Sequence, residues 1–238
     1  MSEPQDDDQQ PNLGFVLPVG EGVIPESAVV LSPAEVYQIR KRQLWSWPKR
    51  FEVWPLTLGP HLATAIVSLS SFAVNVNARQ MFHLYAQQFF WPTTIPVIVF
   101  SSVAFWASFE SFVTRPLLTK APRSRLGTGD CDLCFETRAS LIQATCGLVV
   151  PASISFLTSA LVALGQRTYP IPSLTNPKAL WRTLRRFAGG FRLSGPLLLG
   201  GHVVMGGVLT HMMLNANRFV LQADKQAAGK MAVYPRVS

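Results

Sequence analysis

Charged residues are scarce in this chain of 238 residues. Only 14% are Asp, Glu, Lys or Arg, whereas 48% are hydrophobic; soluble domains usually have about 25% charged residues. Four long windows contain no charge: 26 residues between Glu52 and Arg79, 30 between Arg79 and Glu110, 28 between Arg138 and Arg167, and 25 between Arg192 and Arg218. This absence argues against a soluble helical core, in which polar and apolar positions would alternate.

The charge-free windows predict an all-α membrane protein. A helix needs about 20 mostly apolar residues to cross the hydrocarbon layer, and a charge near its centre costs roughly 2.5–3.5 kcal/mol. We expect a four-helix transmembrane bundle over 55–215, with spans at about 56–77, 91–113, 140–164 and 193–215, followed by a basic tail at 216–238. The net charge of +8 then belongs to loops beside the lipid bilayer, and no nucleic-acid partner is implied.

The first 31 residues contain no Lys or Arg. They combine acidic residues with Pro and Gln, a composition that cannot bury a core, so we expect a disordered acidic tail at 1–31. This composition is the opposite of an Arg-rich transit peptide, and it lacks the apolar core of a secretory signal. Import into an organelle would therefore depend on internal signals.

Residues 32–54 predict an amphipathic helix at the membrane interface. Ser32 and Glu35 have the spacing of a capping box, and Pro33 occupies the first helical position. A basic cluster at 40–42 follows, and three tryptophans, which favour the headgroup zone, are predicted as membrane-interface anchors: Trp45, Trp47 and Trp54. A second interfacial helix is predicted before the fourth span, where Leu180, Leu184 and Phe187 lie on one side and arginines beside them.

The distribution of Lys and Arg in the loops predicts how the chain is oriented across the membrane. With four spans, the side that holds both termini and the loop at 114–139 carries 14 Lys and Arg residues, and the opposite side carries seven. The positive-inside rule places the termini in the cytosol, or in the matrix for a protein of the mitochondrial inner membrane. Polar residues of the first span, such as Ser68, Ser70 and Ser71, predict contacts with neighbouring helices. Pro92, Pro96 and Pro151 predict bends, which gives a compact bundle with kinks.

Cysteine is also scarce, and two of the three cysteines form the pair Cys131-x-x-Cys134 in the stretch "GTGDCDLCFETR". A structural zinc site requires four Cys or His ligands, and the histidines are scattered over other spans. A redox dithiol is chemically conceivable, but the neighbouring Asp130, Asp132 and Glu136 disfavour the thiolate. A pair that shapes a tight loop, with glycines supplying the turn, is the favoured interpretation.

This loop resembles that of the transmembrane protein 126 family. The resemblance consists of a Thr-Gly-Asp, a Cys-x-x-Cys and a Thr-Arg in this order before an apolar helix with glycine and proline, here Thr128, Gly129, Asp130, Cys131, Cys134, Thr137 and Arg138. The spacing between Thr-Gly-Asp and the cysteines is shorter here than in the family. The resemblance implies a four-span protein of the mitochondrial inner membrane, with its termini in the matrix if the positive-inside count holds.

The family resemblance also implies a function. It points to a non-enzymatic scaffold in the assembly of the membrane arm of respiratory complex I, with complex I membrane-arm subunits and other assembly factors as partners. No catalytic residue, cofactor or metal is implied, and a haem between His61 and His202 is disfavoured because isolated histidines in packed helices usually bond to neighbours. The alternative is a four-span membrane thiol-disulfide oxidoreductase that uses Cys131 and Cys134.

Overall fold

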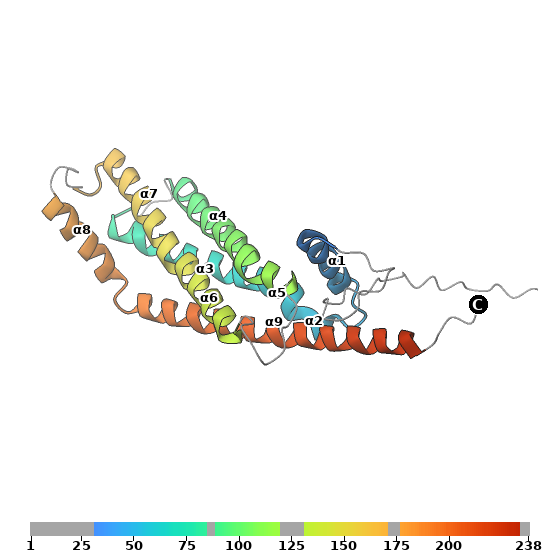
Figure 1. Cartoon of the computed structure of the whole chain (residues 1–238). Helices are drawn as coiled ribbons and strands as arrows, with labels where there is room; N and C mark the ends of the chain where they lie inside the picture. Colours follow the sequence, from blue (N-terminus) through green and yellow to red (C-terminus); the bar gives the residue numbers. More distant parts are fainter. Residues whose placement is uncertain (1–30, 85–88, 120–130, 171–176, 234–238) are drawn as a thin grey trace, which may run out of the picture.

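The computed structural model describes residues 31–84, 89–119, 131–170 and 177–233, and every regular element in these ranges is helical. The α-helices are α1 (Pro33–Trp45), α2 (Arg50–Thr57), α3 (Gly59–Met81), α4 (Phe90–Phe109), α5 (Arg115–Thr119), α6 (Asp132–Ala144), α7 (Val150–Gln166), α8 (Pro177–Gly190) and α9 (Ser194–Val233). Two π-helical turns, η1 (Glu110–Thr114) and η2 (Thr145–Val149), join α4 to α5 and α6 to α7. Figure 1 shows an elongated bundle with α1 towards one end and α8 at the other.

Three continuous helices are long and apolar enough to cross a membrane: Phe90–Thr119, Asp132–Gln166 and Ser194–Gln226. They confirm the predicted spans at 91–113, 140–164 and 193–215 as apolar helices. The span predicted at 56–77 consists of α2 and α3, which meet at a 47° bend and make a fourth crossing if the pair is counted as one span. The chain is therefore a helical, multi-pass membrane protein.

The helices differ from the predicted segments in their ends. The predicted capping box is confirmed, because the Ser32 backbone N–H donates to the Glu35 carboxylate at 2.7 Å and the Ser32 hydroxyl accepts from the Glu35 N–H at 3.3 Å. The single helix expected over 32–54 is two helices, because α1 ends at Trp45 and α2 begins at Arg50. The fourth span does not end at 215, since α9 continues to Val233.

Polar side chains of α3 face other helices, as the sequence predicted. The hydroxyls of Ser68 and Ser102 lie 2.8 Å apart, and the Asn75 amide donates to Thr94 at 2.8 Å, so two such pairs join α3 to α4. Arg79, which lies just beyond the span predicted at 56–77, is buried in the last turn of α3. Its guanidinium donates to the Thr93 hydroxyl at 2.7 Å and to the Phe89 carbonyl at 3.2 Å. Burial of this cation is offset by these acceptors.

Two prolines leave backbone carbonyls that accept hydrogen bonds from side chains of neighbouring helices. A proline in a helix has no N–H for the carbonyl four residues earlier, and each of Pro116 and Pro151 follows a π-helical turn. Four residues before Pro151, the carbonyl of Gly147 accepts from the Ser70 hydroxyl of α3 at 3.0 Å. Four residues before Pro116, the carbonyl of Phe112 accepts from Arg138 of α6 at 3.1 Å. In both places a side chain of another helix therefore supplies the donor that the proline lacks.

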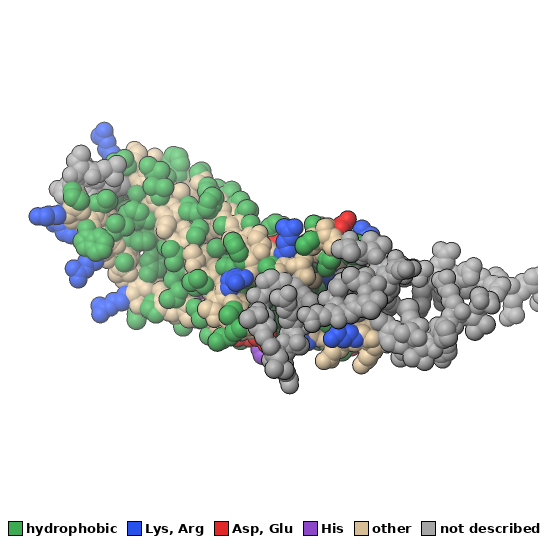
Figure 2. Space-filling view, in the orientation of Figure 1, with side chains coloured by type: hydrophobic (Ala, Val, Ile, Leu, Met, Phe, Trp, Pro, Cys, Tyr) green, Lys and Arg blue, Asp and Glu red, His purple; other side chains and the backbone are tan. Residues whose placement is uncertain are grey.

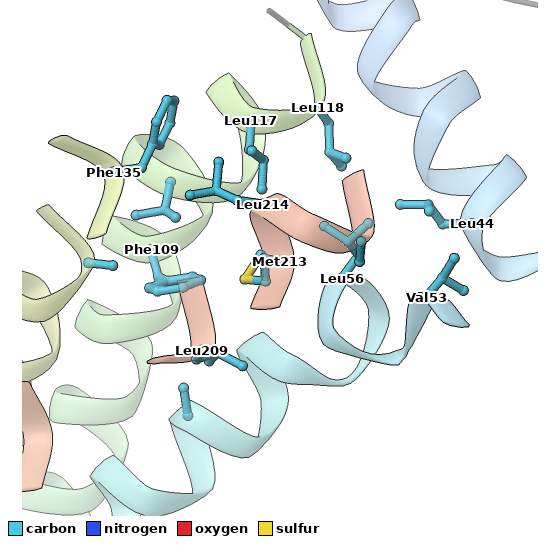
Figure 3. Packing of buried hydrophobic residues seen from close by; sticks show 14 of the residues in the cluster. Leu44, Val53, Leu56, Phe109, Leu117, Leu118, Phe135, Leu209, Met213 and Leu214 are labelled. Carbon is cyan, nitrogen blue, oxygen red and sulfur yellow. The ribbon is translucent and has the colours of Figure 1, made fainter. Parts of the chain in front are cut away.

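The main hydrophobic core lies at the α1 end of the bundle. Figure 3 shows side chains from distant parts of the chain converging there, among them Leu44 of α1, Leu56 of α2, Phe109 of α4, Phe135 of α6 and Met213 of α9. Met213 and Phe109 are almost completely buried. Close packing of these side chains, which supplies the contacts that hold helices together in lipid, fixes α1 and α9 against the remaining helices. A second cluster, at the α8 end, joins Phe187 to Ala78, Phe82 and Ala163.

We predict that Ser70→Ala lowers the free energy of unfolding by about 1 kcal/mol, because the Gly147 carbonyl loses a donor where water cannot replace it. Unfolding of the purified chain in detergent micelles, followed by circular dichroism, measures the change. Ser153→Ala is the matched control, since the exposed Ser153 hydroxyl bonds only to the carbonyl of Val149 in its own helix. Equal stability of the two variants would contradict the assigned role of Ser70.

Candidate functional site

The Cys-x-x-Cys pair forms the first turn of α6. Cys131 is the N-cap residue, and the backbone N–H of Cys134 donates to the Cys131 carbonyl at 2.8 Å. Both thiols are free and exposed. The glycine turn predicted before them, together with Thr128, Gly129 and Asp130, lies outside the described residues. The pair therefore begins a helix, and its predicted role in shaping a tight loop stays a prediction.

The acidic neighbours do not govern the thiol chemistry as the sequence suggested. Hydrogen bonds from the thiol and the backbone N–H of Cys134 lower the pKa of the Cys131 thiol, and Asp132 opposes this only weakly. The carboxylate of Asp132 pairs with Arg218, and that of Glu136 lies 2.9 Å from the ring of His211. Asp132 thus raises the pKa of the Cys131 thiol, in the direction that the sequence predicted, but the hydrogen bonds from Cys134 outweigh it and the net shift is downwards.

Thr137 and Arg138 have separate structural roles. The Thr137 hydroxyl donates to the Leu133 carbonyl of its own helix at 2.7 Å. Arg138 reaches across to the Phe112 carbonyl that Pro116 leaves without a backbone donor, and its guanidinium lies 5.7 Å from the centre of the Phe135 ring. The Thr-Arg part of the motif therefore ties α6 to the bend between α4 and α5.

Helix α1 is attached to the same end of the bundle by ionic contacts. Arg40 pairs with Asp224 of α9, and both side chains are buried, while Gln43 donates to the other Asp224 oxygen at 2.7 Å. Lys41 lies 3.3 Å from Glu110. Arg40 and Lys41 are thus bound to protein carboxylates, and the interfacial role predicted for residues 32–54 stays a prediction. Asp224 and Glu110 were missed as partners because they lie far away in the sequence.

Tyr37 completes this attachment and borders a small cavity. Its hydroxyl bonds to the Glu110 carboxylate and accepts from Lys41 at 3.2 Å. Burial and the Glu110 bond raise the pKa of the Tyr37 phenol. Burial also lowers the pKa of Lys41, but its bonds to Tyr37 and Glu110 outweigh this and raise it. The cavity has a volume of about 60 Å³ and is bordered also by His61 and the buried Thr114, whose hydroxyl lacks a hydrogen-bond partner in the described part of the chain.

The three tryptophans lie at this end as well. Trp45 is half exposed at the end of α1, while the ring of Trp47 packs edge-on against Phe219 of α9 at 6.4 Å between centroids. The Trp47 ring N–H points to the Glu52 carboxylate at 3.4 Å, and Trp54 is partly buried in α2. Trp47 therefore packs against protein, and the role of all three as interface anchors stays a prediction.

The histidines occupy different surroundings. His61 is exposed beside the α1 cavity, whereas His202 of α9 is buried. The His202 ring lies so close to Gly147 that a Cβ there would be 2.4 Å from it, and its Nδ1 is 3.5 Å from the Gln143 amide. No group of three or more His, Cys, Asp and Glu side chains in the described ranges could hold a metal ion. The absence of a cofactor stays a prediction.

Comparison with known proteins identifies the family of this chain. A family model described as Transmembrane protein 126 matches residues 34–192. The chain belongs to the transmembrane protein 126 family. Transmembrane protein 126 of Drosophila melanogaster is 26% identical over 165 residues, which are 69% of this chain and 71% of that protein. No solved structure matches the chain.

The transmembrane protein 126 match confirms the family resemblance recognised in the cysteine loop. It runs from α1 to the connection after α8, so it includes Arg40, Glu110 and Arg138, and it stops just before α9. The partners that α9 supplies to the matched region, Asp224 among them, therefore lie outside the matched range. The family match gives no support to the thiol oxidoreductase alternative.

The geometry at Cys131 predicts how its thiol reacts. Cys134→Ala removes a hydrogen-bond donor to the Cys131 thiolate, so the midpoint of the pH dependence of Cys131 alkylation should move upwards. At neutral pH, alkylation by iodoacetamide should slow by about two- to tenfold, as measured by mass spectrometry of the Cys131 peptide. Leu133→Ala, an exposed residue in the same turn, is the control. A Cys134→Ala midpoint equal to that of the wild type would show that Cys134 does not stabilise the thiolate.

Proposed function

We propose that this protein is a non-enzymatic scaffold of the mitochondrial inner membrane that assists assembly of the membrane arm of respiratory complex I. Membership of the transmembrane protein 126 family, over residues 34–192, is the observation that carries the proposal, because the family resemblance implies this role. The multi-pass helical architecture supports it, since a scaffold for membrane subunits must present helix surfaces within the bilayer.

Four crossings, with both termini in the matrix, are part of this proposal. Tyr37 and Lys41 of α1 contact Glu110, at the end of the α4 span from which the chain leads to α6. At the opposite end of α3, the Phe82 carbonyl accepts from Thr168, just beyond α7. The bent α2–α3 pair thus runs between the same two ends of the bundle as α4 and α7, which favours counting it as one span.

Helix α9 carries the outer surface best suited to a partner helix. Leu197, Gly201, Val204 and Val208 recur every three or four residues and are all exposed, and nothing lies within 4 Å of a Cβ added at Gly201. Beside this stripe, a shallow groove of about 370 Å³ is bordered by Val203, Val204, Val208 and Met212 of α9 and by Glu136 of α6. Small residues allow transmembrane helices to approach closely, and van der Waals packing then drives their association.

We expect Gly201→Leu to weaken the association of the chain with complex I membrane-arm subunits by about tenfold or more. The bulky side chain would keep a partner helix away from α9, but it meets no atom of the chain itself. Affinity purification from intact mitochondria with quantitative mass spectrometry measures the association, and native gels of the same samples report the amount of assembled complex I.

Gly165→Leu is the matched control, because Gly165 is also exposed, lies on α7 and has nothing within 4 Å of an added Cβ. It should bind partners as the wild type does. If cells without this protein assembled complex I at the normal rate, the proposed function would be refuted. If Gly201→Leu alone had no effect, the α9 stripe would be excluded and the scaffold role would need another surface.

A further inference from the structure

The two sides of the membrane differ in their acidic residues. All 13 Asp and Glu residues lie at 1–52, 110–136 or 224, and none occurs at 53–109 or 137–223. The acid-free segments include the whole α3–α4 connection and the whole stretch from α7 to α9. That end of the bundle carries seven cations: Arg79, Arg167, Lys178, Arg182, Arg185, Arg186 and Arg192. It therefore has a net charge of +7 without a carboxylate to balance it.

Helix α8 concentrates this charge on one face. Residues three and four apart lie on the same side of a helix, so Lys178, Arg182, Arg185 and Arg186 form one stripe, and all four are exposed. Phe187 lies on the opposite side, where it packs in the cluster with Ala78, Phe82 and Ala163. Figure 2 shows Lys and Arg side chains gathered at the α8 end, beside a largely hydrophobic surface over the middle of the bundle. The apolar side of α8 thus packs against the bundle, and its cationic side is exposed.

The cations of α8 differ from those of α1 in their partners. In α1, Arg40 pairs with Asp224 and Lys41 with Glu110. In α8, Arg186 donates to the Tyr169 hydroxyl at 3.1 Å and Arg182 to the Lys178 carbonyl at 3.5 Å. Among the described residues, none of the four α8 cations forms a salt bridge. The cationic face of α8 is therefore open to an anion, since no described carboxylate compensates it.

We propose that the cationic face of α8 binds the phosphate groups of anionic phospholipids. The flanking helices α7 and α9 cross the membrane, so α8 is held where lipid headgroups are abundant. Trp181 and Leu184 are exposed beside the cationic stripe and reach the adjoining acyl chains, an arrangement typical of helices at a membrane surface. Arginine matches phosphate with two parallel hydrogen bonds, which makes a phosphate headgroup a better partner for this face than a neutral one.

The test uses the full chain, stripped of lipid in detergent, and native mass spectrometry with added phosphatidylglycerol or phosphatidylcholine. We expect the wild type to prefer the anionic lipid, and the preference to fall as salt is raised. The quadruple variant K178Q/R182Q/R185Q/R186Q should bind phosphatidylglycerol at least about tenfold more weakly. Replacing the three α8 arginines by lysine keeps the charge and should retain most of the binding. Circular dichroism checks that both variants remain helical.

The matched control, R42Q/R50Q/R115Q/K225Q, removes the same charge from the other end of the molecule and should leave the affinity unchanged. Equal weakening in both quadruple variants would show a general charge effect and would overturn the proposal, as would a wild type without preference for the anionic lipid. Soluble glycerol phosphate at the same concentration should not displace the lipid. If it did, α8 would hold a free-phosphate site and the lipid assignment would be wrong.

Discussion

The fold depends on one constraint: backbone carbonyls inside hydrocarbon need donors, because no water is present to supply them. Pro116 and Pro151 each lack the backbone N–H that a long apolar helix would otherwise provide. The Phe112 carbonyl accepts a hydrogen bond from Arg138 instead, and the Gly147 carbonyl accepts one from Ser70. These two hydrogen bonds therefore join α6 to the α4–α5 helix, and α3 to the α6–α7 helix. Gly147 has a further partner, since the ring of His202 in α9 also bonds to its backbone. The bent spans are consequently stabilised as a set rather than singly.

This constraint gives the motif at the start of α6 a structural meaning. Arg138 completes the bend after η1, Asp132 and Glu136 engage α9, and Phe135 is buried in the core. The same end receives α1, through Arg40, Lys41 and Tyr37. A rigid, cross-linked end leaves the outer faces of α4, α7 and α9 as the surfaces for lipid and for other helices, which is the property that the proposed scaffold uses.

Sequence patterns predicted the features that local composition determines. Charge-free windows located the apolar helices, the Ser32–Glu35 spacing located the start of α1, and the period of Leu180, Leu184 and Phe187 located α8. Contacts between distant residues could not be predicted in this way. Nothing near Arg40 indicates Asp224, 184 residues away, and nothing near Arg79 indicates that Thr93 and the Phe89 carbonyl bury it. The continuation of α9 beyond 215 was missed because the charges of 218–225 end an apolar window without ending a helix. Pro151 was recognised but Pro116 was not, and neither were the side chains that bond to the carbonyls four residues before them.

The number of crossings is tested most directly by the position of α1 relative to the start of α6. A chain whose one cysteine replaces Gln38, an exposed residue of α1, is compared in sealed membrane vesicles of known orientation with a chain that retains only Cys131. A maleimide that cannot cross membranes should label both sites from the same side, since the bent α2–α3 pair and α4 together cross twice. Labelling of the two positions from opposite sides would mean three crossings, and would contradict both the four-span account and the attachment of α1 to Glu110 and Asp224.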